Sequence, residues 1–264
     1  QKLFRLAKRY KKRYSSKIGV LTFEPMPKMF FNSKLKNFRL SNLNQKIENL
    51  SKFDVDFVII KKFNSKFSKT KSISFIKETL GKKLNPKFIF VSNNFRFGNK
   101  REGNVKQLIK YEKFYKYKII KPNPLIIKKQ VVSSSLLRKF LQDGKLNTVN
   151  KLLKRNWSID GKVQKGRQLG KKIGFPTANI DIKNYVLAKS GVYAVKAKKM
   201  KSSNYIKGIA NLGYRPTFNG KKILLEVHLF NFSGNLYNKL LSVEFLKFIR
   251  KEKKFRNVNQ LRAQ

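Results

Sequence analysis

Short apolar runs alternate with amphipathic segments along the first half of the chain. The apolar runs are rich in β-branched and aromatic residues and lie at residues 18–23, 56–60 and 87–91. The segments between them carry apolar residues at helical spacing and lie at residues 40–50 and 72–80. Runs of the first kind are typical of buried strands, and strands that alternate with helices predict βαβ units around a parallel sheet. We therefore expect an α/β fold over residues 1–127.

Two further short helices are predicted at residues 133–140 and 146–153. After Trp157, glycine becomes frequent and the apolar stretches become short and alternating, at residues 191–197, 205–211, 223–230 and 241–245. Closely spaced strands with Gly and Pro turns predict a small antiparallel barrel. A helix at residues 243–253 is expected to follow or overlap the last strand. This change of pattern places the predicted domains at residues 1–150 and 151–264.

Both ends of the chain have the pattern of interrupted helices. Leu3, Leu6 and Tyr10 lie on one helical face directly after Gln1, and residues 260–264 have the composition of a helix that is cut short. We therefore expect a fragment of a longer protein. No apolar stretch resembles a signal peptide or reaches the roughly 18 residues that a membrane span needs, so a cytoplasmic location is predicted.

The chain is strongly basic. Its 264 residues include 63 Lys and Arg against 13 Asp and Glu, which gives a formal net charge of +50. Most of these cations are lysines spread along the whole sequence, whereas a surface that reads phosphates favours clustered arginines. Each single lysine is therefore better explained as part of a solvated face, although the summed charge must attract polyanions at low salt.

The residue inventory excludes several kinds of active site. There is no cysteine, which excludes disulfides, thiolate nucleophiles and zinc or iron–sulfur centres that depend on cysteine. His228 is the single histidine, so a metal site built from several histidines is excluded as well. With 41% hydrophobic and 13% aromatic residues, the chain has enough apolar side chains to fold around a core.

A glycine-rich stretch contains the most informative motif. It leads directly into the sequence Pro-Thr-Ala-Asn, and its glycines are Gly161, Gly166, Gly170 and Gly174. Such glycines let backbone amides turn towards an anion, but they also serve tight hairpins. Thr177 and Asn179 are two positions apart, so on an extended segment their side chains leave the same face. Their oxygens suit Mg²⁺ that carries a nucleotide phosphate; the alternative is that they only cap a turn.

An acidic residue lies within a strongly apolar predicted strand. Around Glu226 the apolar side chains face one side of the strand, and Glu226 and His228 face the other. A carboxylate in such a strand is costly unless it is paired or used. Glu226 is therefore either a general base for a substrate hydroxyl or the partner of one of the many lysines. For His228 we favour the simpler interpretation, a strand residue whose hydrogen bonds are satisfied.

Taken in order, the motifs of the second half closely resemble the riboflavin kinase module. They are the glycine-rich loop with Gly-Phe-Pro-Thr-Ala-Asn, the segment 211–218, the strand around Glu226 and the segment 245–255. The resemblance implies ATP-dependent phosphorylation of the ribityl 5′-hydroxyl of riboflavin to give FMN, with Mg²⁺ as the metal.

Carried over by position, this resemblance also implies roles for individual residues. Thr177 and Asn179 would hold Mg²⁺ and phosphate, and Glu226 would be the catalytic base. The glycines that would shape the loop over ATP are Gly166, Gly170 and Gly174. The residues implied on the flavin side are Arg215, Arg250 and Glu252. Arg250 has an alternative role as an ordinary helix cation paired with a carboxylate.

The first half resembles the FAD synthetase (FMN adenylyltransferase) module that is fused to the kinase in bifunctional bacterial enzymes. The matching segments are 21–27, 91–98 and 133–138. The residues that the resemblance implies for flavin or nucleotide binding are Asn94, Phe95, Arg96, Ser134, Ser135 and Arg138. The alternatives are that Phe95 and Phe97 belong to the core and that residues 133–138 form a helix N-cap followed by a surface charge.

This half also departs from the family pattern. The family's paired-histidine H-x-G-H motif would lie immediately before Gln1, and Met26 stands where a further histidine is expected. A glycine expected before Asn94 is replaced by Ser92 or Asn93. We therefore predict that adenylylation is absent or badly impaired in this chain.

The resulting prediction is a Rossmann-like nucleotidyltransferase domain without its first strand, followed by a small Greek-key β-barrel kinase domain with a C-terminal helix. The predicted ligands are riboflavin, FMN, ATP and Mg²⁺, with no specific nucleic acid and no membrane, and the oligomeric state is left open. Two rival functions are a basic nucleic-acid-binding protein, suggested by aromatic residues among the lysines, and a non-catalytic remnant that binds flavin or nucleotide.

Overall fold

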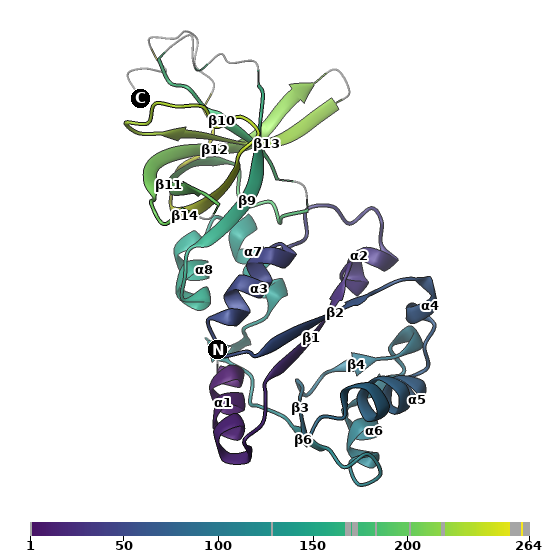
Figure 1. Ribbon diagram of the computed structural model, residues 1–264. Coiled ribbons are helices and arrows are strands. Elements are labelled where there is room, and N and C mark those ends of the chain that lie inside the picture. The colour runs from purple at the N-terminus through teal and green to yellow at the C-terminus, as the bar shows by residue number, and fades with distance from the viewer. Residues whose placement is uncertain are drawn as a thin grey trace. The chain divides into compact units, whose positions relative to one another are not determined.

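The chain forms two compact units in the computed structural model (Figure 1). Unit 1 comprises Gln1–Leu35 and Leu43–Val132, and unit 2 comprises Lys36–Asn42 and Ser133–Gln264. The structure describes residues 2–127, 129–166, 170, 174–182, 184–200, 202–217, 220–253 and 260.

Unit 1 is an α/β unit with parallel strands. Its helices are α1 (Lys2–Tyr14), α2 (Pro27–Phe31), α3 (Leu43–Ser51), α4 (Ser65–Ser68), α5 (Ser72–Ser74), η1 (Phe75–Leu84), η2 (Asn99–Arg101) and α6 (Val105–Lys110). Its strands are β1 (Gly19–Glu24), β2 (Phe57–Lys62), β3 (Phe88–Phe90), β4 (Arg96–Phe97), β5 (Gly103–Asn104), β6 (Lys118–Ile120), β7 (Ile126–Ile127) and β8 (Gln130–Val131). The pairs β1–β2 and β3–β6 are parallel, and β4–β5 and β7–β8 are antiparallel. The predicted parallel pairing is thus confirmed, within two separate two-stranded parallel sheets of the described residues.

Helix α1 packs through aromatic contacts. Phe4 stacks on Phe53 with ring centroids 5.2 Å apart, and Tyr10 meets Phe88 and Phe90 of β3 edge-on at 4.8 and 5.4 Å. Edge-to-face contacts of this kind add to the free energy gained by burying the rings. The sequence predicts an apolar helical face from Leu3, Leu6 and Tyr10, and Tyr10 of this face contacts the rest of the unit.

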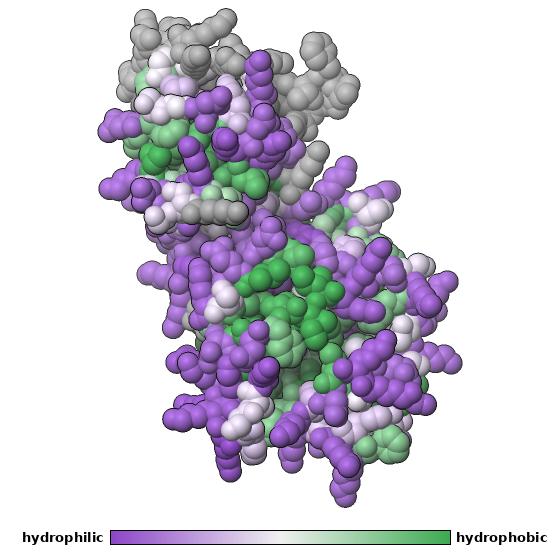
Figure 2. All heavy atoms as spheres, in the orientation of Figure 1, coloured by the Kyte–Doolittle hydropathy of each residue, from purple (hydrophilic) through white to green (hydrophobic). Residues whose placement is uncertain are grey.

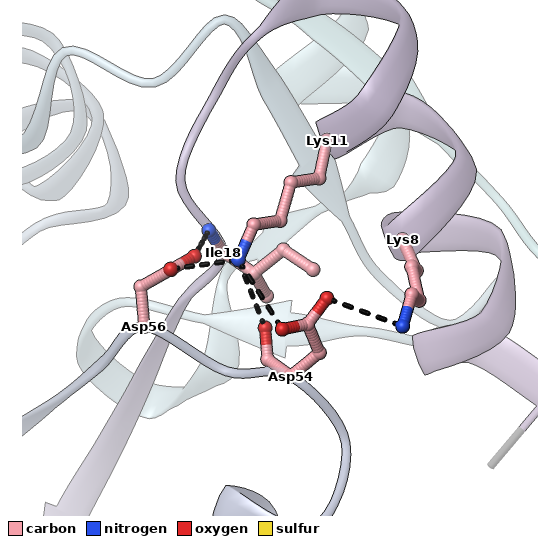
Figure 3. Close-up of polar contacts among 5 residues, drawn as sticks. All are labelled: Lys8, Lys11, Ile18, Asp54 and Asp56. Atoms are coloured by element: carbon pink, nitrogen blue, oxygen red, sulfur yellow. Dashed lines mark hydrogen bonds and ion pairs between the residues drawn. The ribbon is translucent and has the colours of Figure 1, made fainter.

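An ion-pair cluster orients α1 against the segment that leads into β2 (Figure 3). Lys11 Nζ donates to Asp56 Oδ1 at 2.7 Å, and Asp56 Oδ2 accepts the backbone N–H of Ile18 at 2.7 Å. Asp54 lies 3.5 Å from the Nζ atoms of both Lys8 and Lys11. The hydrogen bonds from Lys11 and Ile18 hold the pKa of Asp56 below its ordinary value. Because the cluster is open to solvent, it fixes an orientation more than it adds stability.

In its described residues, unit 2 is a closed six-stranded barrel with two helices of more than one turn. The helices are α7 (Ser134–Gln142) and α8 (Leu146–Leu153). The strands are β9 (Trp157–Gln164), β10 (Ala178–Asp181), β11 (Gly191–Lys199), β12 (Ile206–Thr217), β13 (Gly220–Leu229) and β14 (Leu240–Arg250). They close in the order β10-β13-β12-β11-β14-β9, and neighbours are antiparallel. Since side chains alternate along a strand, the apolar set fills the barrel and the polar set faces outward.

The helix predicted at residues 243–253 is wrong, because β14 runs through this segment as far as Arg250. Leu241, Val243 and Phe245 are buried at every second position, which is the period of a strand and not of a helix. Pairing with both β11 and β9 closes the barrel, and this long-range requirement overrides the local helical pattern. Residues 254–259 and 261–264, which the remaining C-terminal helix predictions concern, lie outside the described residues.

The segment Lys36–Asn42 belongs to unit 2 although α2 and α3 flank it in the sequence. The indole Nε1 of the fully buried Trp157 donates to the carbonyl of Leu40 at 2.9 Å. The N–H of Val186 donates to the carbonyl of Arg39 at 2.8 Å. The barrel core is therefore completed by a segment that lies far from the barrel strands in the sequence. The hydrogen bond from Trp157 to Leu40 joins residues 117 positions apart.

Glu244 of β14 is the centre of a polar cluster on the barrel surface. Its carboxylate accepts the hydroxyl of Tyr205 at 2.6 Å and the amide of Asn156 at 2.9 Å, and it lies 3.3 Å from Lys196 Nζ. Burial raises the pKa of Glu244, but these hydrogen bonds outweigh the burial, so its pKa in the folded chain is lower than the ordinary value of 4.5.

Unit 2 is therefore expected to lose stability as the pH falls below 4.5. A carboxyl group whose pKa is lower in the folded state stabilises the fold above the unfolded pKa, and this contribution is lost as the pH falls through the folded pKa. Urea unfolding followed by the fluorescence of Trp157, the single tryptophan, measures the free energy of unfolding of this unit at each pH. Glu244→Gln is expected to flatten the pH dependence. An unchanged slope in this variant would show that other groups cause it.

Candidate functional site

Three polar side chains from adjacent strands form a row on the outside of the barrel. Asn179 of β10 lies opposite Glu226 of β13, and Glu226 in turn lies opposite Asn211 of β12. The neighbours Leu225 and Val227 are buried inside, so the alternation of the strand directs Glu226 outward. Side chains that lie directly opposite on antiparallel strands have Cβ atoms roughly 4.5–5.5 Å apart. The structure thus brings Asn179 and Glu226 together.

The loop glycines lie against the predicted phosphate and metal ligands. Asn179 is only 9% exposed, and a Cβ atom at Gly166 would overlap its side-chain amide. A Cβ atom at Gly170 would overlap a carbonyl oxygen of the segment before Thr177 and lie 3.5 Å from Thr177 Oγ1. Gly174 has open space around it but a φ of +88°, which side-chain-bearing residues rarely adopt. Gly166 and Gly170 therefore need to be glycine because there is no room for a Cβ atom, and Gly174 because of its backbone conformation.

A pocket of about 610 Å³ opens beside Thr177. Its floor comes from inward-facing barrel residues, and its walls come from the segment around Thr177 and from the connection between β13 and β14. The lining residues are Val163, Pro176, Thr177, Ala178, Val227, Leu229, Phe232, Ser233, Gly234, Asn235, Leu236 and Tyr237. A hollow of this size, apolar with a few polar groups at its rim, is typical of small-molecule sites.

Glu252 joins the polar row through Asn211. The side-chain amide of Asn211 donates to Glu252 Oε1 at 3.1 Å. Gly213 lies so close to the Glu252 carboxylate that a Cβ atom there would overlap it. The Oδ1 atom of Asn211 is buried and has no hydrogen-bond partner among the residues that the structure describes. Sequence reasoning missed Asn211 as a site residue, because its contact with Glu252 joins positions 41 residues apart.

The two predicted flavin-side arginines lie on strands. Arg250 ends β14, so its alternative role as a helix cation is wrong, and its guanidinium donates to the carbonyl of Lys251 at 3.1 Å. Arg215 lies in β12 opposite Lys222 of β13. The side chain of Arg215 and residues 167–169 and 171–173 of the glycine-rich loop are outside the described part of the chain.

The first group of candidate adenylylation residues lies in unit 1, in the turn that follows β3 and at the start of β4. Asn94 is exposed and accepts a hydrogen bond from Ser92 Oγ at 2.9 Å. Phe95 is half-buried and stacks on Phe97 with ring centroids 5.6 Å apart, whereas Arg96 is exposed. Phe97 is buried, which confirms its interpretation as a core residue. The carboxyl end of a parallel strand is the edge at which α/β folds bind ligands.

The second group lies in unit 2, on α7. Ser133 caps this helix and accepts the N–H of Leu136 at 3.2 Å, as the N-cap interpretation predicts, and Ser134 and Ser135 are exposed in the first turn. Arg138 is not a surface charge. Its Nε donates to the carbonyl of Phe38 at 2.7 Å, its guanidinium carbon lies 3.6 Å from the centre of the Phe38 ring, and burial lowers its pKa.

Arg138→Ala is expected to lower the free energy of unfolding of unit 2 by about 1–3 kcal/mol, because the change removes a charged hydrogen bond and a cation–π contact. Urea unfolding followed by Trp157 fluorescence measures the loss. Lys139→Ala, at the exposed neighbouring position of the same helix, is the matched control and is expected to change stability by less than about 0.5 kcal/mol. Equal effects of the two changes would contradict a structural role for Arg138.

The site suits a metal that arrives with a nucleotide. Among the described residues, no group of three or more His, Cys, Asp or Glu side chains could hold a metal ion by itself. Thr177 instead offers a hydroxyl at the pocket, and Asn179 offers an amide oxygen two positions further along the chain, opposite Glu226. Mg²⁺ keeps several waters and is commonly bound by a few protein oxygens together with substrate phosphates, so this donor set fits Mg²⁺.

The two halves of the chain match two protein families. The riboflavin kinase family model matches residues 153–264, and the FAD synthetase family model matches residues 1–136. A bifunctional riboflavin kinase/FMN adenylyltransferase of Buchnera aphidicola from Schizaphis graminum is 40% identical over 93% of this chain and 79% of its own length. The enzymes of the same name are 40% identical in Haemophilus influenzae and 35% identical in Escherichia coli K12, over 94% of this chain and 80% and 79% of theirs.

A solved structure has the same fold. A crystal structure from Streptococcus pneumoniae, described as that of a macrolide-efflux protein, has a TM-score of 0.84 and 26% identity over 99% of this chain and 84% of its own. Within the described residues, we find no helix whose length and apolarity would let it cross a bilayer. The matched families, the relatives and the geometry agree, and the chain belongs to the family of bifunctional riboflavin kinase/FMN adenylyltransferases.

Proposed function

We propose that unit 2 transfers the terminal phosphate of ATP to the 5′-hydroxyl of riboflavin, at the site built around Thr177, Asn179 and Glu226. The observation that carries this proposal is the register of the barrel, which sets Glu226 directly opposite Asn179. An acceptor of protons therefore lies next to the residues that suit a nucleotide phosphate. Phosphoryl transfer needs little more than positioning, charge stabilisation and a base.

The nucleotide is expected to lie with its phosphates at Thr177 and its base in the pocket of about 610 Å³. Thr177 lines the rim of this pocket, and the glycines at 166 and 170 allow the loop backbone to lie close to the phosphates. When bound, Mg²⁺ held by Thr177 and Asn179 would neutralise part of the negative charge on the phosphates. These residues therefore orient the nucleotide, and the apolar floor excludes water.

Glu226 is the proposed general base. It accepts the proton of the 5′-hydroxyl while the hydroxyl oxygen forms a bond to the γ-phosphorus, and the bond from that phosphorus to the β–γ bridging oxygen breaks to release ADP. The flavin side is proposed to comprise Arg215, Arg250 and Glu252. The buried Oδ1 of Asn211 supports this arrangement. This oxygen accepts no hydrogen bond from the described residues, and the other hydroxyls of the ribityl chain are donors that would supply one.

We propose further that the adenylyltransferase function resides in residues 1–150 and the kinase function in residues 151–264. The matches of the FAD synthetase and riboflavin kinase families, at residues 1–136 and 153–264, support this division. The residues proposed for binding flavin or nucleotide in adenylylation are Asn94, Phe95, Arg96, Ser134, Ser135 and Arg138. The impairment of adenylylation stays a prediction, and so does the cytoplasmic location.

The proposed reaction is tested by incubating the chain with riboflavin and MgATP and separating the flavins by chromatography. Formation of FMN is the expected result. FAD in addition to FMN would show that the adenylyltransferase module is active and would overturn the prediction of its impairment. The absence of both products would contradict the proposed reaction and favour a remnant that only binds flavin or nucleotide.

Salt separates this function from the rival one, nucleic-acid binding. Figure 2 shows hydrophilic side chains over most of the visible surface of each unit and an apolar area on unit 1. The 63 Lys and Arg residues that give the net charge of +50 are spread along the whole sequence. We expect binding to a polyanion to weaken steeply between low and physiological salt, because released counterions drive it. Riboflavin affinity, measured by flavin fluorescence over the same salt range, is expected to change less than about threefold. A flavin affinity that falls as steeply as polyanion binding would contradict a dedicated flavin site.

A further inference from the structure

The single histidine of the chain contacts the segment that carries Thr177. His228 lies on the outer face of β13, two positions from Glu226, and its Nδ1 is 2.9 Å from the carbonyl oxygen of Pro176. A carbonyl oxygen only accepts hydrogen bonds, so Nδ1 carries the hydrogen and donates it. The other ring nitrogen, Nε2, is then the unprotonated one when the ring is neutral.

This hydrogen bond lies just before the first residue of β10 whose backbone is paired with β13. The pairing of β10 with β13 begins at Ala178, opposite Val227, so Thr177 precedes the first paired residue. The proline ring fixes φ at Pro176, and the peptide between Pro176 and Thr177 is planar. Holding the carbonyl of Pro176 therefore orients the whole peptide plane from which Thr177 begins. The side chain of His228 therefore fixes the peptide between Pro176 and Thr177, which the strand pairing itself does not hold.

The imidazole is itself held in place. His228 lies on β13, which is paired with β12 on one side and with β10 on the other, and His228 is opposite Ile209 of β12. The ring of Phe175 meets the imidazole edge-on at 5.6 Å, and the ring of Phe230 does so at 5.8 Å. A donor on a rigid strand, with two aromatic rings against it, has the preorganisation that a supporting residue of an active site needs.

We propose that His228 is a positioning residue of the kinase site, which sets Thr177 for the nucleotide phosphates through the hydrogen bond from Nδ1 to Pro176. The proposal rests on the proposed function, since it assumes that Thr177 binds the nucleotide. His228 touches no reacting atom in this account. Its effect is on the geometry of Thr177, so it should appear in the use of ATP and not in the binding of riboflavin.

Three variants of His228 in the full chain separate a hydrogen bond from mere bulk. His228→Asn places an N–H at the position of Nδ1, His228→Gln places it one bond further out, and His228→Phe keeps a ring without a donor. Because a displacement of about 1 Å at an active site costs up to about 10²-fold, we expect the Gln and Phe variants to lower kcat/KM for MgATP by about tenfold to hundredfold. We expect the Asn variant to recover most of this loss, while KM for riboflavin changes little in all three.

The tautomer is measured without reference to activity. Because the chain has one histidine, all imidazole signals in a ¹⁵N spectrum of the labelled protein come from His228. We expect a protonated Nδ1 and an unprotonated Nε2 in the neutral ring. Thermal unfolding followed by Trp157 fluorescence shows whether each variant is folded at the assay temperature.

Three results would overturn the proposal. One is a neutral ring protonated at Nε2, and another is an Asn variant as impaired as the Phe variant. The third is a loss of riboflavin binding as large as the loss of ATP use, which a general disturbance of the barrel would cause. Thr177→Ala separates this proposal from the function on which it rests. If Thr177→Ala leaves kcat/KM for MgATP unchanged, the proposed phosphate role of Thr177 fails, even where the spectrum reports the hydrogen bond from His228.

Discussion

Replacing Glu226 by glutamine is expected to lower kcat for riboflavin phosphorylation by about 10²–10⁴-fold. The amide has nearly the same shape as the carboxylate but accepts no proton, so the 5′-hydroxyl must react without a base. Because glutamine has nearly the same shape, we expect residue 226 to keep its backbone pairing opposite Asn179 and Asn211. Steady-state formation of FMN, measured by chromatography, gives the ratio of the rates.

The control for this change is Asp181→Asn, on β10 two positions beyond Asn179. It neutralises another carboxylate of the same strand pair and is expected to change kcat less than about threefold. Riboflavin affinity, measured by fluorescence, is expected to survive in the Glu226 variant, because the lost group acts on the proton and not on the flavin ring. A Glu226→Gln variant that turns over at the wild-type rate would remove Glu226 from the role of base.

Gly166→Ala is expected to lower kcat/KM for MgATP by about 10²-fold. The added Cβ atom would occupy the place of the Asn179 side-chain amide, and Asn179 is 91% buried (9% exposed), so it has little room to move away. The change therefore displaces one proposed ligand of the metal and phosphate without altering its chemistry. Kinetics at varied ATP and saturating riboflavin measure the effect.

The matched control is Lys165→Ala, at the exposed position just before Gly166. It adds no atom near Asn179 and is expected to change kcat/KM less than about threefold. Riboflavin phosphorylation that is equally fast in Gly166→Ala and in the wild-type chain would mean that the position of Asn179 does not matter. In that case the metal and phosphate ligands would have to be sought elsewhere on the loop.

The sequence predicts the parts of the site that depend on local pattern. The alternation around Glu226 places its side chain on the polar face of a strand, as in β13, and Asn179 lies opposite it in β10, whereas Thr177 precedes the first residue of β10. What it cannot supply is the register between strands. Only the closed barrel determines that Asn179, Glu226 and Asn211 lie side by side, because Glu226 pairs with Asn179, 47 positions before it, and with Asn211, 15 positions before it, on the two neighbours of β13.

The errors have the same physical origin. The segment 243–253 has a helical pattern, but pairing with both β11 and β9 makes it a strand as far as Arg250. The hydrogen bond from Trp157 to Leu40 joins positions 117 residues apart, so no local signal predicts that residues 36–42 complete the core of unit 2. Arg138 resembles a surface charge in the sequence, because its partner Phe38 is 100 residues away.

A crystal structure of the chain with riboflavin and MgADP would show directly whether Glu226, Thr177 and Asn179 form the kinase site. We expect the 5′-hydroxyl of the flavin to lie about 2.6–3.2 Å from the carboxylate of Glu226, with the phosphates of the nucleotide at Thr177 and Asn179. A flavin whose 5′-hydroxyl lies away from Glu226, or a nucleotide whose phosphates contact neither Thr177 nor Asn179, would contradict this site.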